Sequence, residues 1–175
     1  MKLNAQELRE VDETAIQEKL KRIKRRPLFF ILENIYDTYN VGGLFRLADA
    51  LTVEKMYLCG TMEIPPNSRI KKASIGTYKV VPWEYKKSAK EAIEELSGVK
   101  IIAVEQSEKA VPYSETDYQM PLALVLGNET SGITAGTLKL AHQIVEIPMW
   151  GINKSLNVIV SAAIVSYWAV EKNRV

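Results

Sequence analysis

The sequence of 175 residues is poor in the side chains that build disulfides, zinc sites and catalytic triads. It contains one cysteine, Cys59, and one histidine, His142. An intrachain disulfide is therefore impossible, and a reducing cytoplasm is the simplest location for the protein. A Cys/His zinc site is excluded, a Ser-His-Asp triad is not expected, and we expect no bound metal. His142 is expected to be an ordinary surface or edge residue.

The chain also lacks a long apolar segment and a strong excess of charge. The main apolar run, residues 156–170, includes Asn157, Ser161 and Ser166, so it is too short and too polar to cross a membrane. The polar N-terminus, mixed in charge, does not fit a signal peptide. A net charge of +2 neither requires nor excludes a nucleic-acid partner. With 47% hydrophobic residues and no repeat or linker, residues 1–175 are expected to form one globular domain.

Apolar runs of strand length alternate with segments of helical character. The expected strands span residues 28–33, 55–59, 78–81, 100–105, 121–126 and 143–147. The expected helices span residues 1–26, 40–50, 67–74, 88–96, 134–141 and 155–173. This alternation predicts the α/β class, with a mostly parallel sheet flanked by helices. In such a sheet, ligands bind at the carboxyl ends of the strands.

Residues 1–26 are interpreted as a helical lead-in that ends in a basic run before Pro27. Thr14 and Gln17 have the spacing of a capping box. The cations of the run are Lys19, Lys21, Arg22, Lys24, Arg25 and Arg26. Such a run is either a solvated helix end, favoured by the helix dipole, or a contact for RNA phosphates. A second basic patch, formed by Arg69, Lys71 and Lys72, lies on the helix that Asn67 can cap.

The loop after the first strand leads into a glycine-rich helix. Asn40 is placed as the N-cap of this helix, and Arg46 follows six residues later. Gly42 and Gly43 in a first turn cost helix stability, so they indicate a close approach to a ligand or to another segment. Taken alone, Asn40 is explained as well by a helix cap as by a functional role. Arg46 alone would be explained as a partner in a surface ion pair.

Two further loops follow apolar strands near the C-terminus. Residues 127–132 are rich in glycine and hold Glu129, which by itself would only need to bind backbone amides. Ser155 is expected to cap the C-terminal helix, and Asn157 in its first turn needs hydrogen-bond partners if it is buried. This helix has almost no polar face, so we expect it to be buried on all sides, with a second subunit as one covering surface. Neither a G-x-G-x-x-G nor a P-loop motif is present, which disfavours ordinary dinucleotide and nucleotide sites.

Together these segments resemble the SpoU (TrmH-like) branch of the SPOUT superfamily of RNA methyltransferases. The motifs that carry the resemblance are Asn40-x-Gly42-x-x-x-Arg46-x-Ala48-Asp-Ala, Leu126-Gly-Asn-Glu129-x-x-Gly132 and Ile147-Pro-Met-x-Gly151-x-x-x-Ser155-Leu-Asn157-Val. The resemblance covers nearly the whole chain from about Leu28, and the three motifs occur in order at strand ends. The sequence departs from the family pattern at Leu51-Thr52, where an aromatic-Gly pair is common, and at Lys154.

The resemblance implies methyl transfer from S-adenosylmethionine to a ribose 2′-hydroxyl of RNA. It also implies a trefoil knot within residues 120–175, the part that binds the cofactor and forms a homodimer. The knot segments would be the loops near Glu105, at 127–132 and at 147–157. The implied cofactor contacts are Leu126, Gly127, Ile147, Met149, Ser155 and Leu156. The implied catalytic residue is Arg46, with Asn40, Glu129 and Asn157 shaping the site.

A guanidinium, with a pKa above about 12, is a poor general base. We therefore expect Arg46 to bind the adjacent phosphate and stabilise the developing alkoxide, with Glu129 orienting it through a charge-assisted bond. The predicted RNA contacts are Arg22, Arg25, Arg26, Arg69, Lys71 and Lys72. Because no separate RNA-binding domain precedes the fold, transfer RNA is favoured over ribosomal RNA. The alternatives are a non-catalytic RNA-binding module, disfavoured by the complete motif set, and a small-molecule enzyme, which lacks a recognisable nucleophile.

Overall fold

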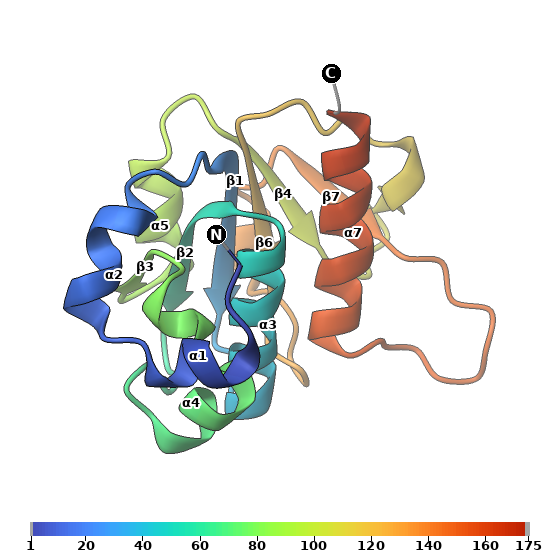
Figure 1. Cartoon of the computed structure of the whole chain (residues 1–175). Helices are drawn as coiled ribbons and strands as arrows, with labels where there is room; N and C mark the ends of the chain where they lie inside the picture. Colours follow the sequence, from blue (N-terminus) through green and yellow to red (C-terminus); the bar gives the residue numbers. More distant parts are fainter. Residues whose placement is uncertain (1, 174–175) are drawn as a thin grey trace.

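The computed structural model describes residues 2–173, which form one seven-stranded sheet flanked by helices (Figure 1). All strand pairs are parallel, in the order β3-β2-β1-β6-β4-β7-β5. The strands are β1 (Arg26–Glu33), β2 (Val53–Cys59), β3 (Trp83–Lys86), β4 (Lys100–Val104), β5 (Val111–Pro112), β6 (Leu122–Leu126) and β7 (Gln143–Glu146). The predicted α/β class with a parallel sheet is confirmed.

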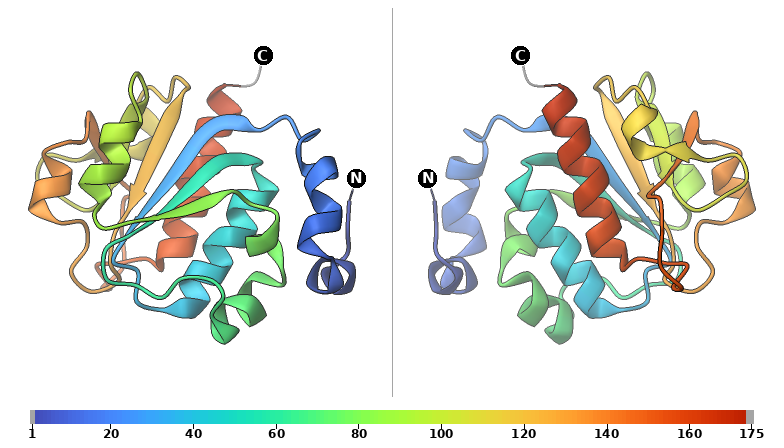
Figure 2. Two further views of the ribbon diagram at one scale, coloured as in Figure 1. Left: turned by 90° about the vertical axis from the view of Figure 1, so that its left-hand side faces the viewer. Right: turned by 90° about the vertical axis from the view of Figure 1, so that its right-hand side faces the viewer.

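Helices cover both faces of the sheet (Figures 1 and 2). One face is covered by α3 (Thr38–Ala50), α4 (Ser68–Ser74) and α7 (Val158–Lys172), the other by α5 (Ala89–Glu95) and α6 (Ala135–Leu138). The N-terminal helices α1 (Ala5–Glu10) and α2 (Glu13–Leu20) pack beside the 3-10 turn η1 (Thr77–Lys79), and η2 (Tyr113–Glu115) follows β5. Neighbouring residues of β1, such as Phe30 and Ile31, are fully buried on opposite faces, which explains why its sequence is apolar without alternation.

The site lies where the connections of two neighbouring strands diverge. β1 and β6 are adjacent, but the chain leaves β1 through α3 toward β2 and leaves β6 through α6 toward β7, on the other side of the sheet. Such a switch point opens a crevice beyond the carboxyl ends of the strands. A hydrogen bond of 2.7 Å from Asn128 Nδ2 to the carbonyl oxygen of Asn34 joins the two loops there. The topology therefore directs the polar loops of the sequence to one place.

The two glycines of α3 allow other helices to approach it closely. A Cβ atom at Gly42 would lie 2.5 Å from Cβ of Ala73 and 2.8 Å from the backbone nitrogen of Ser74, both in α4. A Cβ atom at Gly43 would collide with the side chain of Ile159 in α7. The close approach that the sequence indicated is therefore to other segments of the chain.

Substitution of Gly42→Ala is expected to lower the free energy of unfolding by about 1–3 kcal/mol, because the new methyl group overlaps backbone atoms of α4. Urea denaturation measures the change. Gly136→Ala is the matched control, since its Cβ would meet only Thr134 Oγ1 at 4.0 Å and alanine favours the helix. Equal stability of the two variants would contradict the assigned packing role.

The N-terminal segment differs from the predicted single helix over residues 1–26. The chain forms two short helices, and α1 begins with a capping box of Asn4 and Glu7. Thr14 does not cap α2, because it lies inside that helix and its amide donates to Asp12 Oδ1 at 2.8 Å. The side chain of Gln17, its predicted partner, lies outside the described residues. The extended backbone at Val11 ends α1, so one helix cannot continue through this point. Arg26 already belongs to β1, and α2 ends at Leu20 well before Pro27.

Three other boundaries were predicted wrongly. Residues 78–81 are not a strand: backbone bonds close the η1 turn, and the strand forms at Trp83–Lys86, paired with β2. The cap of α3 is Asp37 instead of Asn40, and the cap of α7 is Asn157 instead of Ser155. Among the described residues, no helix is long and apolar enough to cross a membrane.

Candidate active site

Three loops that are distant in the sequence are joined by two side-chain hydrogen bonds. Asn40 Nδ2 donates to Glu129 Oε1 at 2.9 Å, and Asn157 Nδ2 donates to Asn40 Oδ1 at 3.0 Å. Asn40 is buried in the first turn of α3, between a carboxylate from the loop after β6 and the cap of α7. The structure thus brings together three of the four residues predicted to form the catalytic site.

The carboxylate of Glu129 is held by hydrogen bonds from three surrounding groups and from its own backbone amide. Besides Asn40, the backbone amides of Tyr36 and Asp37 donate to its two oxygens, each at 3.2 Å. Desolvation raises the pKa of Glu129, but the hydrogen bonds from Asn40 and from backbone amides, its own included, outweigh this, so the pKa lies below its ordinary value of 4.5. Glu129 is therefore ionised at neutral pH and fixes the segment that enters α3.

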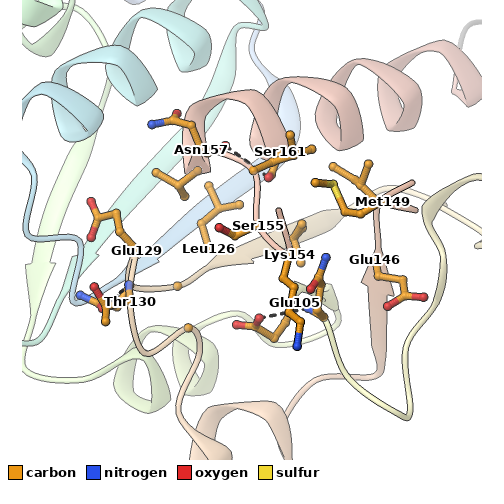
Figure 3. Close-up of a pocket in the computed structure, with 18 of the residues that line it drawn as sticks. Glu105, Leu126, Glu129, Thr130, Glu146, Met149, Lys154, Ser155, Asn157 and Ser161 are labelled. Carbon is orange, nitrogen blue, oxygen red and sulfur yellow. Dashed lines mark hydrogen bonds between the residues drawn. The ribbon is translucent and has the colours of Figure 1, made fainter. Parts of the chain in front are cut away.

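A pocket of about 370 Å³ lies beside this cluster, beyond the carboxyl ends of β4, β6 and β7 (Figure 3). All six residues predicted to bind the cofactor line it: Leu126, Gly127, Ile147, Met149, Ser155 and Leu156. Glu129 and Asn157 lie at one side of the pocket, with Met149 and Glu146 at the other. Its size falls within the range of small-molecule sites in proteins.

Charged groups in the pocket are mostly acidic. The lining contains the carboxylates of Glu105, Glu129 and Glu146 and a single ammonium group, that of Lys154. Both oxygens of Glu105 also accept backbone amides, from Gln106 at 3.0 Å and Ile133 at 2.7 Å. The net negative lining favours a ligand that carries positive charge.

The loop after β6 is packed tightly against its surroundings. A Cβ atom at Gly127 would lie 2.5 Å from the carbonyl carbon of Gly132, and one at Gly132 would collide with the carboxylate of Glu105. Gly132 also has a positive φ of 66°. There is no room for a side chain at either glycine, and the positive φ at Gly132 also favours glycine. These constraints explain the spacing of Gly127 and Gly132 in the second motif.

Arg46, the fourth predicted catalytic residue, does not join the cluster. It lies exposed on α3 and, within the described part of the chain, makes no side-chain hydrogen bond or ion pair. The expected bond from Glu129 to Arg46 was wrong, because backbone amides and Asn40 take up the carboxylate instead. Asn157 was expected to be buried; it is exposed as a helix cap, yet it does find the partners it needs.

One of the six predicted RNA contacts has a structural role instead. Arg25 is half-buried and donates to the carbonyl oxygens of Val53 at 3.2 Å and Val80 at 2.7 Å. Burial lowers the pKa of its guanidinium. These two hydrogen bonds fix the N-terminal segment to the rest of the fold. Arg25 is therefore no longer proposed as an RNA contact. The other five are exposed cations: Arg22, Arg26, Arg69, Lys71 and Lys72.

The two residues that are rare in this sequence have no catalytic surroundings. Cys59 is fully buried, and desolvation raises the pKa of its thiol to about 12, with a further increase from Glu33 and Glu91. The thiol is therefore protonated and unreactive at neutral pH. His142 lies exposed just before β7, where its Nδ1 accepts the backbone amide of Ile101, near the start of β4, at 2.9 Å.

Sequence reasoning missed several residues that contribute to the site. The amides of Tyr36 and Asp37 gave no signal, because backbone donors do not depend on residue type. Glu146 and Lys154 line the pocket from the end of β7 and the loop beyond it. Glu146 directly precedes the third motif and Lys154 lies within it, which was a usable signal, since loops after parallel strands line one edge of the sheet.

A parallel sheet with a polar cluster at its switch point and a ligand-sized pocket beside that cluster is typical of a ligand-binding α/β protein. The sequence matches the model of the SpoU rRNA Methylase family over residues 27–167. This match covers most of the chain, which therefore belongs to that family. The resemblance inferred from the three motifs is confirmed.

Known proteins of similar sequence and structure agree with this assignment. The chain is 33% identical over 152 residues to the tRNA (guanosine(18)-2'-O)-methyltransferase of Escherichia coli K12, an alignment that covers 83% of this chain and 64% of the relative. It therefore spans less than two thirds of that relative. The A. aeolicus TrmH/SpoU tRNA modifying enzyme is 28% identical, with a TM-score of 0.78 and coverage of 90% and 84%. The AdoMet-bound rRNA methyltransferase of Sinorhizobium meliloti shares the fold, with a TM-score of 0.80 at 23% identity and coverage of 96% and 61%.

Proposed function

We propose that the chain is an S-adenosylmethionine-dependent RNA methyltransferase that modifies a ribose 2′-hydroxyl, with tRNA favoured over rRNA. The observation that carries the proposal is the joining of the three family motifs through Asn40, Glu129 and Asn157 at the edge of the pocket. The named activities of the E. coli and A. aeolicus relatives support tRNA as the substrate class. A cytoplasmic location follows from this substrate.

The pocket fits S-adenosylmethionine in size, polarity and charge. Its acidic lining suits a ligand with a sulfonium and an ammonium group, while Leu126, Met149 and Leu156 offer apolar surface to an adenosine moiety. When bound, the cofactor supplies an activated methyl group. The side chain of Lys154 is the cation available to the cofactor carboxylate among the residues lining the pocket.

The four predicted catalytic residues have two roles in the proposed reaction: three of them position the reactants, and Arg46 stabilises charge. Glu129, Asn40 and Asn157 hold the three loops in one geometry, so that methyl donor and acceptor oxygen meet in line. Arg46, free of intrachain partners among the described residues, binds the RNA phosphate next to the target ribose and stabilises the developing alkoxide. The hydroxyl proton leaves to solvent, since a guanidinium is a poor proton acceptor.

A second copy of the chain is proposed to cover the outer face of α7. The inner face is buried against the sheet, but Val160 and Tyr167 are 45% and 48% exposed on the outer face. An apolar face left open in one chain favours a partner of the same kind. Because Arg46 lies outside the pocket, a site completed between two copies also explains how Arg46 reaches the reacting groups.

The double substitution Val160→Asp with Tyr167→Asp is expected to convert the protein to a monomer and to lower methyl transfer at least 10-fold, because it places charge in a desolvated interface. Sedimentation velocity and a transfer assay measure the two effects. Leu140→Asp is the matched control, since Leu140 is an exposed apolar residue just after α6, on the opposite face of the sheet from α7. This variant should remain dimeric. A dimer that survives the double substitution would disprove the proposed interface.

We further propose that the segments near Glu105, Gly127–Gly132 and Ile147–Asn157 form the trefoil knot of the superfamily. All three segments line the same pocket, and the amide of Ile133, next to Gly132, donates to the carboxylate of Glu105 at 2.7 Å, which joins the first two. A knot would hold the cofactor loops in place without a large core, which suits a pocket formed mainly by loops.

Transfer of labelled methyl groups from S-adenosylmethionine to unmodified total tRNA and, separately, to rRNA tests the function. We expect incorporation into tRNA. Incorporation into rRNA alone would correct the substrate but keep the chemistry. Absence of transfer, together with absence of cofactor binding in calorimetry, would leave the non-catalytic RNA-binding alternative.

A further inference from the structure

Two tyrosines are exposed beside the proposed site. Tyr36 is 61% exposed and Tyr39 is 52% exposed, whereas Ile35, Thr38 and Asn40 between and beside them are buried. Large aromatic side chains usually bury most of their surface, and exposed ones are enriched where a partner binds. Two exposed rings on so short a segment therefore suggest a binding surface.

The backbone beneath these rings is held in place. The amides of Tyr36 and Asp37 donate to Glu129 at 3.2 Å each, and the amide of Tyr39 donates to Asp37 Oδ1 at 2.8 Å as part of the α3 cap. A ligand that binds the rings therefore orders little additional chain, which lowers the entropic cost of binding.

The rings adjoin the residues proposed to carry the reaction. The carboxylate that holds the Tyr36 amide also accepts from Asn40, which in turn accepts from Asn157 at the edge of the pocket. Tyr39 and Arg46 are seven residues apart on α3, which is about two turns, so both point from the same face of the helix. Both are exposed.

The chemistry of the segment favours bases over phosphates as ligands. Residues 34–40 contain one acid, Asp37, and no lysine or arginine. Within the described chain, neither phenol hydroxyl makes a hydrogen bond, so the rings have no structural polar role. Aromatic faces stack on unpaired bases irrespective of base identity. RNA-modifying sites reach single-stranded or unstacked nucleotides most readily.

We propose that Tyr36 and Tyr39 form a stacking surface for unpaired bases of the RNA strand on either side of the methylated ribose. The inference rests on the proposed function and adds to it that the target lies in a loop or other single-stranded segment. The tyrosines are binding residues: they hold the strand while Arg46 engages its phosphate.

The test uses two single variants, Tyr36→Ala and Tyr39→Ala. They are compared with one double variant that carries both Tyr36→Phe and Tyr39→Phe. Binding of a fluorescein-labelled oligo(A) single strand and of unmodified tRNA is measured by anisotropy across a salt series, and methyl transfer is measured in parallel. Each alanine variant is expected to weaken RNA binding and raise KM about 10-fold. The phenylalanine variant should stay within about 2-fold of wild type. The slope of log K against log salt should not change, because stacking releases no counterions.

Two controls accompany these variants. Cofactor binding by calorimetry should be unchanged in all of them, which shows that they are folded. Tyr85→Ala removes a similarly exposed tyrosine from edge strand β3 and should bind RNA like wild type. Wild-type affinity in both alanine variants, equal losses in the phenylalanine variant, or a reduced salt slope would each overturn the stacking surface while the methyltransferase remains active. Failure of the wild-type protein to bind or methylate any RNA would instead overturn the proposed function, and the inference with it.

Discussion

Arg46→Ala is expected to lower methyl transfer by about 100- to 1000-fold, the range found when a group that stabilises transition-state charge is removed. Arg46 is exposed on α3 and does not line the pocket, so affinity for S-adenosylmethionine should stay within about 2-fold of wild type. The fold should also be preserved, because the side chain makes no intrachain polar contact among the described residues. A loss of kcat without a loss of cofactor affinity is the expected pattern.

Single-turnover transfer to the accepting RNA and calorimetry with the cofactor measure the two quantities. Arg69→Ala is a suitable control, since Arg69 is also an exposed arginine, on neighbouring α4, and its loss should affect RNA affinity more than the chemical step. Transfer by Arg46→Ala at the wild-type rate would remove this residue from the reaction. A parallel fall in cofactor affinity would show that it acts on the pocket instead.

Glu129→Ala is expected to lower transfer by about 100-fold and the free energy of unfolding by about 1–3 kcal/mol. The substitution leaves the amides of Tyr36 and Asp37 and the Nδ2 group of Asn40 without their acceptor. Because the three loops then lose their common contact, positioning of the acceptor ribose suffers together with stability. Urea denaturation and the transfer assay test both parts.

Glu108→Ala, in the loop between β4 and β5, is the control for removal of an exposed carboxylate and should resemble wild type.

The stability difference between wild type and Glu129→Ala should also depend on pH. Since the folded-state pKa of Glu129 lies below 4.5, the contribution of the carboxylate is fully present above that value. It is lost as the pH falls through the lowered pKa. A difference that persists unchanged in strong acid would contradict the assigned hydrogen bonds.

The strands of the central sheet could be predicted from sequence because burial on both faces leaves an apolar run. Such runs mark β1, β4 and β6, and their polar ends marked the loops that form the site. Edge elements could not be predicted in the same way. Trp83–Lys86 is only half-buried and mixed in polarity, so the more apolar residues before it looked like the better strand.

Helix boundaries near the site failed for a different physical reason. Asn40 and Ser155 are both good capping residues, but so are Asp37 and Asn157, and local propensity cannot choose between neighbours. The choice is made by long-range contacts: Asn40 pairs with Glu129, which is 89 positions away, and with Asn157, 117 positions away. The placement of Arg46 outside the pocket also depends on tertiary packing, and motif spacing alone contains no such information.

The most direct test of the central claim is to identify the atom that receives the methyl group. RNA methylated by the wild-type protein would be digested to nucleosides and analysed by mass spectrometry, with Arg46→Ala as the inactive reference. We predict a single 2′-O-methylated nucleoside, with the added mass on the ribose fragment and an unpaired position in the parent RNA. A methyl group on a base, or none in any RNA despite cofactor binding, would contradict the proposed function.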